Sequence, residues 1–250
     1  MMTQPTRAID ATLKPKDRIL VALDVPTASA AREIVAELSD SVGGFKIGLQ
    51  LFTAAGPELV SELVATGNKI FLDLKFHDIP NTVAMAAVEA ARLGVWMFNI
   101  HAIGGREMMA RTVDLVRSVC ESEDLAVPKI IAVTVLTSSD GNVLSEVGIE
   151  SAVDEQVVRL AKLANDCVLD GVVASPREVV AIRQAVDNEN FMLVTPGIRP
   201  VSATNDDQKR VMTFRQAVEN GSDYVVIGRP IIGAKNRLEA VAEILAEIED

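Results

Sequence analysis

The sequence predicts a single α/β domain folded as a closed (β/α)8 TIM barrel. Eight short apolar strands alternate with amphipathic helices, and no linker or repeat marks a second domain. The length of 250 residues suits eight such units, and polar residues recur at the carboxyl ends of the strands, where barrel enzymes place their sites. Two small domains or an open doubly wound sheet would also fit this length, but eight strand–helix units favour the barrel.

The composition indicates an aliphatic core and excludes several classes of partner. Hydrophobic residues make up 49% of the chain, and there is only one Trp and one Tyr. A net charge of −11 argues against nucleic acid or an anionic membrane as partner. Cys120 and Cys167 show no paired spacing and predict buried thiols in a reducing compartment. No run of residues is long and apolar enough to span a bilayer, so we expect a cytoplasmic protein.

The first half of the chain is expected to contain four strand–helix units. Residues 1–17 form a polar leader, broken by Pro5 and Pro15, that we expect to be loosely ordered, and the barrel domain covers 18–250. Thr27 can cap the first helix, and Pro80 suits a first helical turn. The expected strands cover 18–24, 45–48, 71–75 and 95–100, and the expected helices cover 28–38, 57–65, 80–93 and 105–120.

The second half is expected to contain four more units. A capping box at 175–178 and a second cap pattern at 213–216 each predict a helix start. The segments 137–150 and 199–210 are expected to be loops, and 220–223 a turn that leaves a helix. The expected strands cover 129–136, 171–174, 191–194 and 224–227, and the remaining expected helices cover 151–168 and 235–248.

The most informative stretch is 71–83, FLDLKFHDIPNTV. Side chains alternate along a strand, so Asp73 and Lys75 share one face, and Asp78 follows at a turn. An ion pair beside a helix cap would be the ordinary interpretation of these charges. Their position at the end of an apolar strand instead favours a functional site.

A barrel would bring polar residues from several strand ends to one rim. A lysine and an acidic side chain that lie close together favour each other's ionised forms, and a lysine so placed can donate a proton. Gly228 and Arg229 follow the eighth strand, where barrels bind phosphate through backbone N–H groups, although an ordinary turn has the same residues. The residues at this rim are Asp24, Lys46, Asp73, Lys75, Thr137, Arg199 and Arg229.

The sequence does not predict a zinc site. His77 and His101 are the only histidines, they lack the i, i+4 spacing of helical ligands, and no cysteine lies near either. A Mg²⁺ site built from carboxylates stays open on ligand type. His101 could face the pocket or be purely structural, and we leave His77 out of the site.

The segment 73–82, DLKFHDIPNT, closely resembles the signature of the orotidine 5′-phosphate decarboxylase family, of the bacterial type. The resemblance extends over the whole barrel. It includes the strand ends at 22–24, 45–48, 99–102, 134–138, 195–199 and 227–230.

This resemblance implies decarboxylation of orotidine 5′-monophosphate to UMP, the last step of de novo pyrimidine synthesis. It also implies no cofactor, no metal, and a homodimer with its active sites at the interface. By this resemblance Lys75 donates a proton to C6, Asp73 lies beside the substrate carboxylate, and Lys46 bridges Asp73 and the ribose. The other implied contacts are Asp24 to a ribose hydroxyl, Asp78 and Thr82 to the neighbouring subunit's site, Thr137 near the base, and Arg199, Gln208, Gly228 and Arg229 to the phosphate, with 199–210 as a lid.

Two alternatives remain at this level. Mg²⁺-dependent phosphosugar decarboxylases and aldolases of the same suprafamily, such as 3-keto-gulonate-6-phosphate decarboxylase and hexulose-phosphate synthase, share the Asp-x-Lys-x-x-Asp pattern. The residues 79–82 and the loop around Gln208 favour the orotidine 5′-phosphate decarboxylase family. The second alternative is a barrel that binds a nucleotide without turning it over.

Overall fold

Eight parallel strands close into a barrel in the computed structural model, which describes residues 13–198 and 212–249. Each strand pairs with its neighbour in chain order, and β1 pairs with β8 to complete the ring. The predicted TIM barrel is therefore confirmed. The strands are β1 (Ile19–Ala22), β2 (Gly44–Gly48), β3 (Ile70–Phe76), β4 (Met97–His101), β5 (Lys129–Val133), β6 (Gly171–Val173), β7 (Met192–Pro196) and β8 (Tyr224–Ile227).

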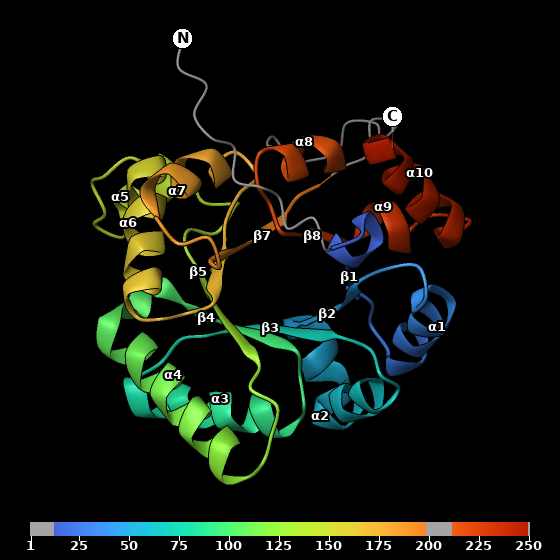
Figure 1. Cartoon of the computed structure of the whole chain (residues 1–250), viewed down its shortest axis with the longest axis horizontal. Helices are drawn as coiled ribbons and strands as arrows, with labels where there is room; N and C mark the ends of the chain where they lie inside the picture. Colours follow the sequence, from blue (N-terminus) through green and yellow to red (C-terminus); the bar gives the residue numbers. More distant parts are fainter. Residues whose placement is uncertain (1–12, 199–211, 250) are drawn as a thin grey trace.

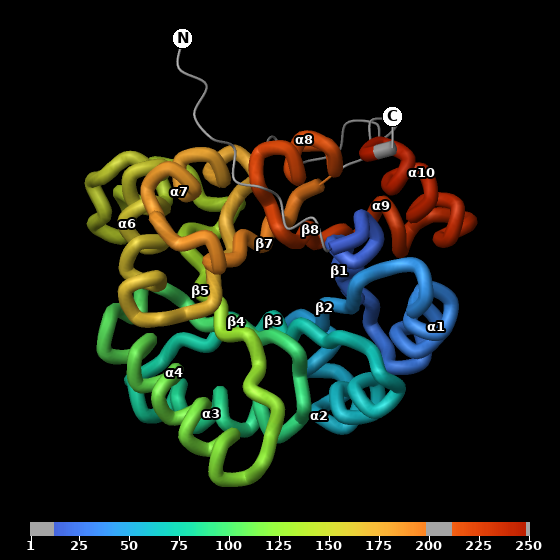
Figure 2. The backbone as a smooth tube through the Cα atoms, viewed as in Figure 1, coloured from blue at the N-terminus to red at the C-terminus, as the bar shows by residue number. Residues whose placement is uncertain are grey.

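The helices surround this ring, as Figures 1 and 2 show looking down the barrel. Two short 3-10 helices, η1 (Pro15–Arg18) and η2 (Ala102–Gly104), precede β1 and follow β4. The α-helices are α1 (Ala28–Leu38), α2 (Leu49–Ala65), α3 (Pro80–Arg92), α4 (Gly105–Ser122), α5 (Gly141–Glu146), α6 (Val153–Asp166), α7 (Val179–Ala185), α8 (Phe214–Glu219), α9 (Arg229–Ile232) and α10 (Arg237–Glu249).

Alternation along the strands produces two separate apolar cores. The larger core joins strand residues such as Leu72 and Phe98 to the inner faces of the helices. A smaller cluster consists of strand residues alone, including Phe71, Met97 and Tyr224, and so it fills the barrel interior. Side chains that share this inward parity at the carboxyl ends of the strands therefore meet at one rim.

Two helix starts differ from the prediction. α2 begins at Leu49 rather than near 57: the chain kinks at Gly56, whose φ is +73°, and Pro57 opens the second part, which is the helix that was predicted. In the segment 175–178, the Ser175 N–H does donate to the Glu178 carboxylate at 2.8 Å, but α7 begins only at Val179. Only one of the two capping-box hydrogen bonds forms, because the Ser175 hydroxyl accepts the Arg177 N–H instead of the Glu178 N–H, and the helix start was placed too early.

Two short helices lie where only loops or turns were predicted. The Asp140 carboxylate accepts the N–H groups of Asn142 and Val143 and so caps α5 inside the expected loop 137–150. α9 covers Arg229–Ile232, directly after Gly228. By contrast, the Thr213–Gln216 capping box opens α8 as expected, because both of its hydrogen bonds form.

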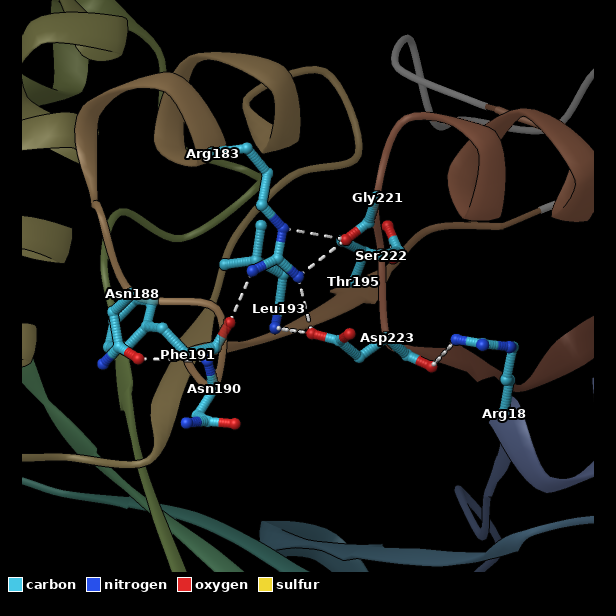
Figure 3. A network of polar contacts seen from close by, with 10 residues as sticks. All are labelled: Arg18, Arg183, Asn188, Asn190, Phe191, Leu193, Thr195, Gly221, Ser222 and Asp223. Carbon is cyan, nitrogen blue, oxygen red and sulfur yellow. Dashed lines mark hydrogen bonds and ion pairs between the residues drawn. The ribbon is translucent and has the colours of Figure 1, made fainter. Parts of the chain in front are cut away.

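The turn at 220–223 does more than leave a helix, which corrects the sequence interpretation. Asp223 is 7% exposed, and its carboxylate accepts the Leu193 N–H at 2.7 Å and pairs with the Arg183 guanidinium at 2.6 Å. Arg183 also donates to the Gly221 carbonyl, and Arg18 donates to the Asp223 carbonyl across the β1–β8 seam (Figure 3). This network ties β7, β8 and the start of β1 together.

We expect Asp223→Ala to destabilise the protein by about 3–5 kcal/mol, because it removes the buried carboxylate that pairs with Arg183, whose side chain is only 15% exposed. The measurement is the free energy of unfolding in urea. Glu62→Ala is the matched control, since it removes the partner of Arg32 from an ion pair that is half-exposed on both sides and screened by water. Equal losses in the two variants would contradict a stabilising role for the buried network.

Candidate active site

The Asp73 carboxylate is the centre of a charged network at the rim. It lies on β3, is 8% exposed, and receives the Lys75 ammonium at 2.6 Å on Oδ1. The Lys46 ammonium, from β2, lies 3.3 Å from Oδ2, and the Asn99 amide, from β4, donates to Oδ1 at 2.7 Å. Three neighbouring strands thus supply opposite charges and a neutral donor to one buried carboxylate.

Lys46 connects this centre to Asp24, which follows β1. Its ammonium lies 3.2 Å from Asp24 Oδ1, and its side chain is 10% exposed while that of Asp24 is 58% exposed. A Cβ at Gly48 would lie only 3.0 Å from Lys46 Nζ, so the absence of a side chain there leaves space for the ammonium. The result is a line of alternating charge, Asp24–Lys46–Asp73–Lys75, that runs from buried to exposed at both ends.

Lys75 occupies an unusual backbone conformation. Its φ is +52°, in the left-handed region, and the pairing of β3 with β4 shifts register between Leu72 and Phe76. A residue with a Cβ in such a conformation costs of order 1–3 kcal/mol and is typical of functional sites. Instead of joining the strand ladder, the Lys75 N–H donates to the Asn99 side-chain oxygen at 2.8 Å.

The structure brings four of the predicted site residues into one network, and Gly228 lies beside it, because a Cβ built there would be 3.5 Å from Asp24 Oδ2. Asp78 is exposed, and its carboxylate accepts the N–H of Ile79. Within the described ranges, no hydrogen bond or ion pair joins the charged network to Asp78, to Thr82 on α3 or to Thr137 beyond β5. The remaining predicted residues are half-buried Gly228, exposed Arg229, and Arg199 and Gln208, which lie outside the described residues.

Asn99 belongs to the strand-end motif 99–102, but the sequence predicted no role for it. Asn99 lies two residues from both Met97 and His101 along β4, so it shares their inward face, and it is fully buried. A polar residue inside an apolar strand was the available signal. Its partners could not be predicted, because the register shift between β3 and β4 is a property of the folded sheet.

The two histidines lie together beside the network, with ring centroids 5.4 Å apart. Burial lowers the pKa of His101 below its ordinary value. His77 and Lys75 lower that pKa further, while the Asp73 carboxylate acts in the opposite direction. Burial thus favours the neutral form of the His101 imidazole beside Lys75.

Within residues 13–198 and 212–249, no group of three or more His, Cys, Asp or Glu side chains is placed to hold a metal ion. Over the same residues, no helix combines the length and hydropathy needed to cross a membrane.

Comparison with known proteins identifies relatives along nearly the whole chain. Residues 17–244 match the family described as orotidine 5′-phosphate decarboxylase / HUMPS. A protein from Geotalea daltonii named orotidine 5′-phosphate decarboxylase is 53% identical over 231 residues, which cover 92% of this chain and 95% of that protein. One of the same name from Geobacter sulfurreducens is 53% identical over 233 residues, covering 93% and 96%.

A solved structure with a similar name also matches the fold of this chain. The crystal structure of orotidine 5′-phosphate decarboxylase from Lactobacillus acidophilus matches with a TM-score of 0.81 at 37% identity, covering 93% of this chain and 99% of that one. The closed barrel, with a charged rim at the carboxyl ends of β1–β4, defines a TIM-barrel enzyme. The chain belongs to the orotidine 5′-phosphate decarboxylase / HUMPS family.

We expect His101 to make stability depend on pH. Because its pKa is lower in the folded protein than in the unfolded chain, the unfolded chain binds more protons between those two values. The His101 contribution is therefore fully present above about pH 6.5 and is lost as the pH falls through the folded pKa. The free energy of unfolding, measured in urea from neutral to mildly acidic pH, should fall more steeply for the native protein than for His101→Gln. Parallel curves would contradict this role.

Proposed function

We propose that this chain decarboxylates orotidine 5′-monophosphate to UMP, without a metal or cofactor, and that Lys75 protonates C6. The ordered line Asp24–Lys46–Asp73–Lys75 is the observation that carries this proposal. The family and the names of relatives about half identical over most of the chain support the reaction. The enzyme is accordingly a carboxy-lyase.

The chemistry requires a positive charge at one carbon. When the C6–carboxylate bond breaks, CO₂ leaves and the electron pair stays on C6, where no adjacent carbonyl fully delocalises it. An ammonium already fixed beside that carbon stabilises the developing charge without waiting for solvent to reorganise, and it then delivers the proton. Lys75, held 2.6 Å from Asp73, has this role, and Asp73 places negative charge beside the departing carboxylate.

Other residues bind the parts of the substrate that are remote from C6. Asp24, 58% exposed in its side chain, and the adjoining Lys46 are placed to bind ribose hydroxyls. Gly228 and Arg229 follow β8, where barrels bind phosphate, and with Arg199 and Gln208 they form the phosphate site of the proposal. Thr137 is assigned to the base. Closure of 199–210 over the phosphate would convert remote binding energy into catalysis.

We further propose a homodimer in which Asp78 and Thr82 complete the partner's site. Both are exposed, and two apolar neighbours in the sequence are exposed with them: Ile79 at 67%, next to Asp78, and Met85 at 48%, three residues after Thr82. A second copy would bury these groups.

Cytoplasmic location is proposed on the two free, buried cysteines, whose pKa values burial raises. The division into a leader at 1–17 and a barrel at 18–250 also stays a proposal.

The first test is the loss of orotidine 5′-monophosphate ultraviolet absorbance in the presence of EDTA. We expect the native protein to remain active and Lys75→Ala to lose about 10²–10⁴-fold in kcat, the usual contribution of a general acid. Lys69→Ala is the control, because Lys69 precedes the opposite end of β3 and contacts Trp96. Activity that EDTA removes and Mg²⁺ restores, or turnover of a phosphosugar instead, would favour the Mg²⁺-dependent alternative.

The shared site has a separate test in mixed dimers. If Asp78 serves the partner's site, Lys75→Ala and Asp78→Ala subunits mixed together form hybrids with one doubly substituted site and one native site. Random mixing should restore about a quarter of native activity, since half of the dimers are hybrids with one intact site. No gain over the separate variants, or full activity in a folded monomer, would contradict the proposal.

A further inference from the structure

We propose that Asn99 is a positioning residue that holds the Lys75 backbone and the Asp73 carboxylate in a single arrangement. The inference rests on the proposed function, because it concerns the same proton donor. It adds a residue that the reaction needs but that touches neither substrate nor product. The argument depends on two hydrogen bonds, on burial, and on the backbone of β3.

The two hydrogen bonds of Asn99 join the residues on either side of Leu74. Its side-chain oxygen accepts the Lys75 N–H at 2.8 Å, and its amide nitrogen donates to Asp73 Oδ1 at 2.7 Å. The amide orientation follows from chemistry, because a backbone N–H needs an acceptor and a carboxylate needs a donor. Asn99 is fully buried, so water does not replace either partner.

The first bond maintains the backbone conformation of Lys75. The ladder between β3 and β4 is interrupted from Leu72 to Phe76, so the Lys75 N–H lacks a regular ladder acceptor. The Asn99 oxygen supplies that acceptor while φ is +52°. A left-handed residue persists only where its surroundings determine it, and here β4 does so through this side chain.

The second bond sets the rotation of the Asp73 carboxylate. Asn99 and Lys75 both donate to Oδ1, which leaves Oδ2 facing Lys46 at 3.3 Å. If the amide donor is lost, only the flexible side chains of Lys46 and Lys75 orient the carboxylate, so neither ammonium group keeps a rigidly held partner. Asparagine is suited to this position because it presents one acceptor and one donor, whereas aspartate offers acceptors alone and alanine offers neither.

The first experiment measures kcat and KM for Asn99→Ala. We expect kcat to fall about 10²-fold, the cost of a misplacement near 1 Å, with a much smaller change in KM because Asp24 and the phosphate contacts are untouched. Thr112→Val is the control. It removes an equally buried polar group, whose hydroxyl bonds to Met108 within α4, away from the rim. A native kcat in Asn99→Ala, or a rise in KM alone, would overturn the inference.

A second variant separates positioning from packing. Asn99→Asp keeps the acceptor for the Lys75 N–H but sets a new carboxyl against Asp73, and a like charge raises the pKa of the introduced group. Once protonated, that group can donate to Asp73 as the amide does. The kcat of Asn99→Asp relative to native should therefore rise as pH falls from about 8 to about 6. A flat ratio would show that only packing matters.

Crystal structures of the variants give a readout that does not depend on turnover. In Asn99→Ala we expect Lys75 to leave the left-handed region, or its ammonium to move beyond hydrogen-bond distance of Asp73. Both unchanged would overturn the role of Asn99. Failure of the native protein to turn over orotidine 5′-monophosphate would instead overturn the proposed function, and these structures would still decide the role of Asn99.

Discussion

The buried Asp73 carboxylate is the constraint on which the rest of the site depends. A charge that is 8% exposed needs partners, and three neighbours provide them: Lys46, Lys75 and the Asn99 amide. Each partner comes from β2, β3 or β4, so the carboxylate tolerates little change in the register of those strands. The same attraction holds a lysine at the rim where a proton donor is needed. The groups that stabilise the folded site and the groups proposed for the chemistry are therefore the same.

Much of the fold could be predicted because the barrel has a strong local pattern. All eight strands were found, and the caps at Thr27 and at Thr213–Gln216 form as the sequence indicated. The errors fall where tertiary contacts decide. Gly56 allows α2 to continue through a kink, and α5 is a single short segment without a clear hydrophobic period. The role of Asp223 depends on Arg183, forty residues away, which no local pattern reveals.

The candidate site was predicted in part. Alternation and strand ends brought Asp24, Lys46, Asp73 and Lys75 to one rim, and the structure places them in one network. The left-handed φ of Lys75 was not predictable, because lysine has no preference for it and the strand register imposes it. Asp78 and Thr82 were assigned to a second subunit, and Arg199, Gln208 and Arg229 to the phosphate, by resemblance alone. Arg199 and Gln208 lie outside the described residues. Their roles therefore depend on the proposed experiments.

The seam between β1 and β8 differs from the other strand pairs in the length of chain that must be ordered before the two strands can meet. The charged network lies on β1–β4, which are consecutive in sequence, whereas the hydrogen bond from Arg18 to Asp223 joins residues 205 positions apart. Contacts between distant segments form late, because the loop entropy is lost before they can stabilise anything. The lysines and acids of the first half can thus meet before the ring closes. Closure by β8 then does two things at once: it removes water from the barrel interior and brings Gly228 beside Asp24 Oδ2, while Lys46 lies against Oδ1.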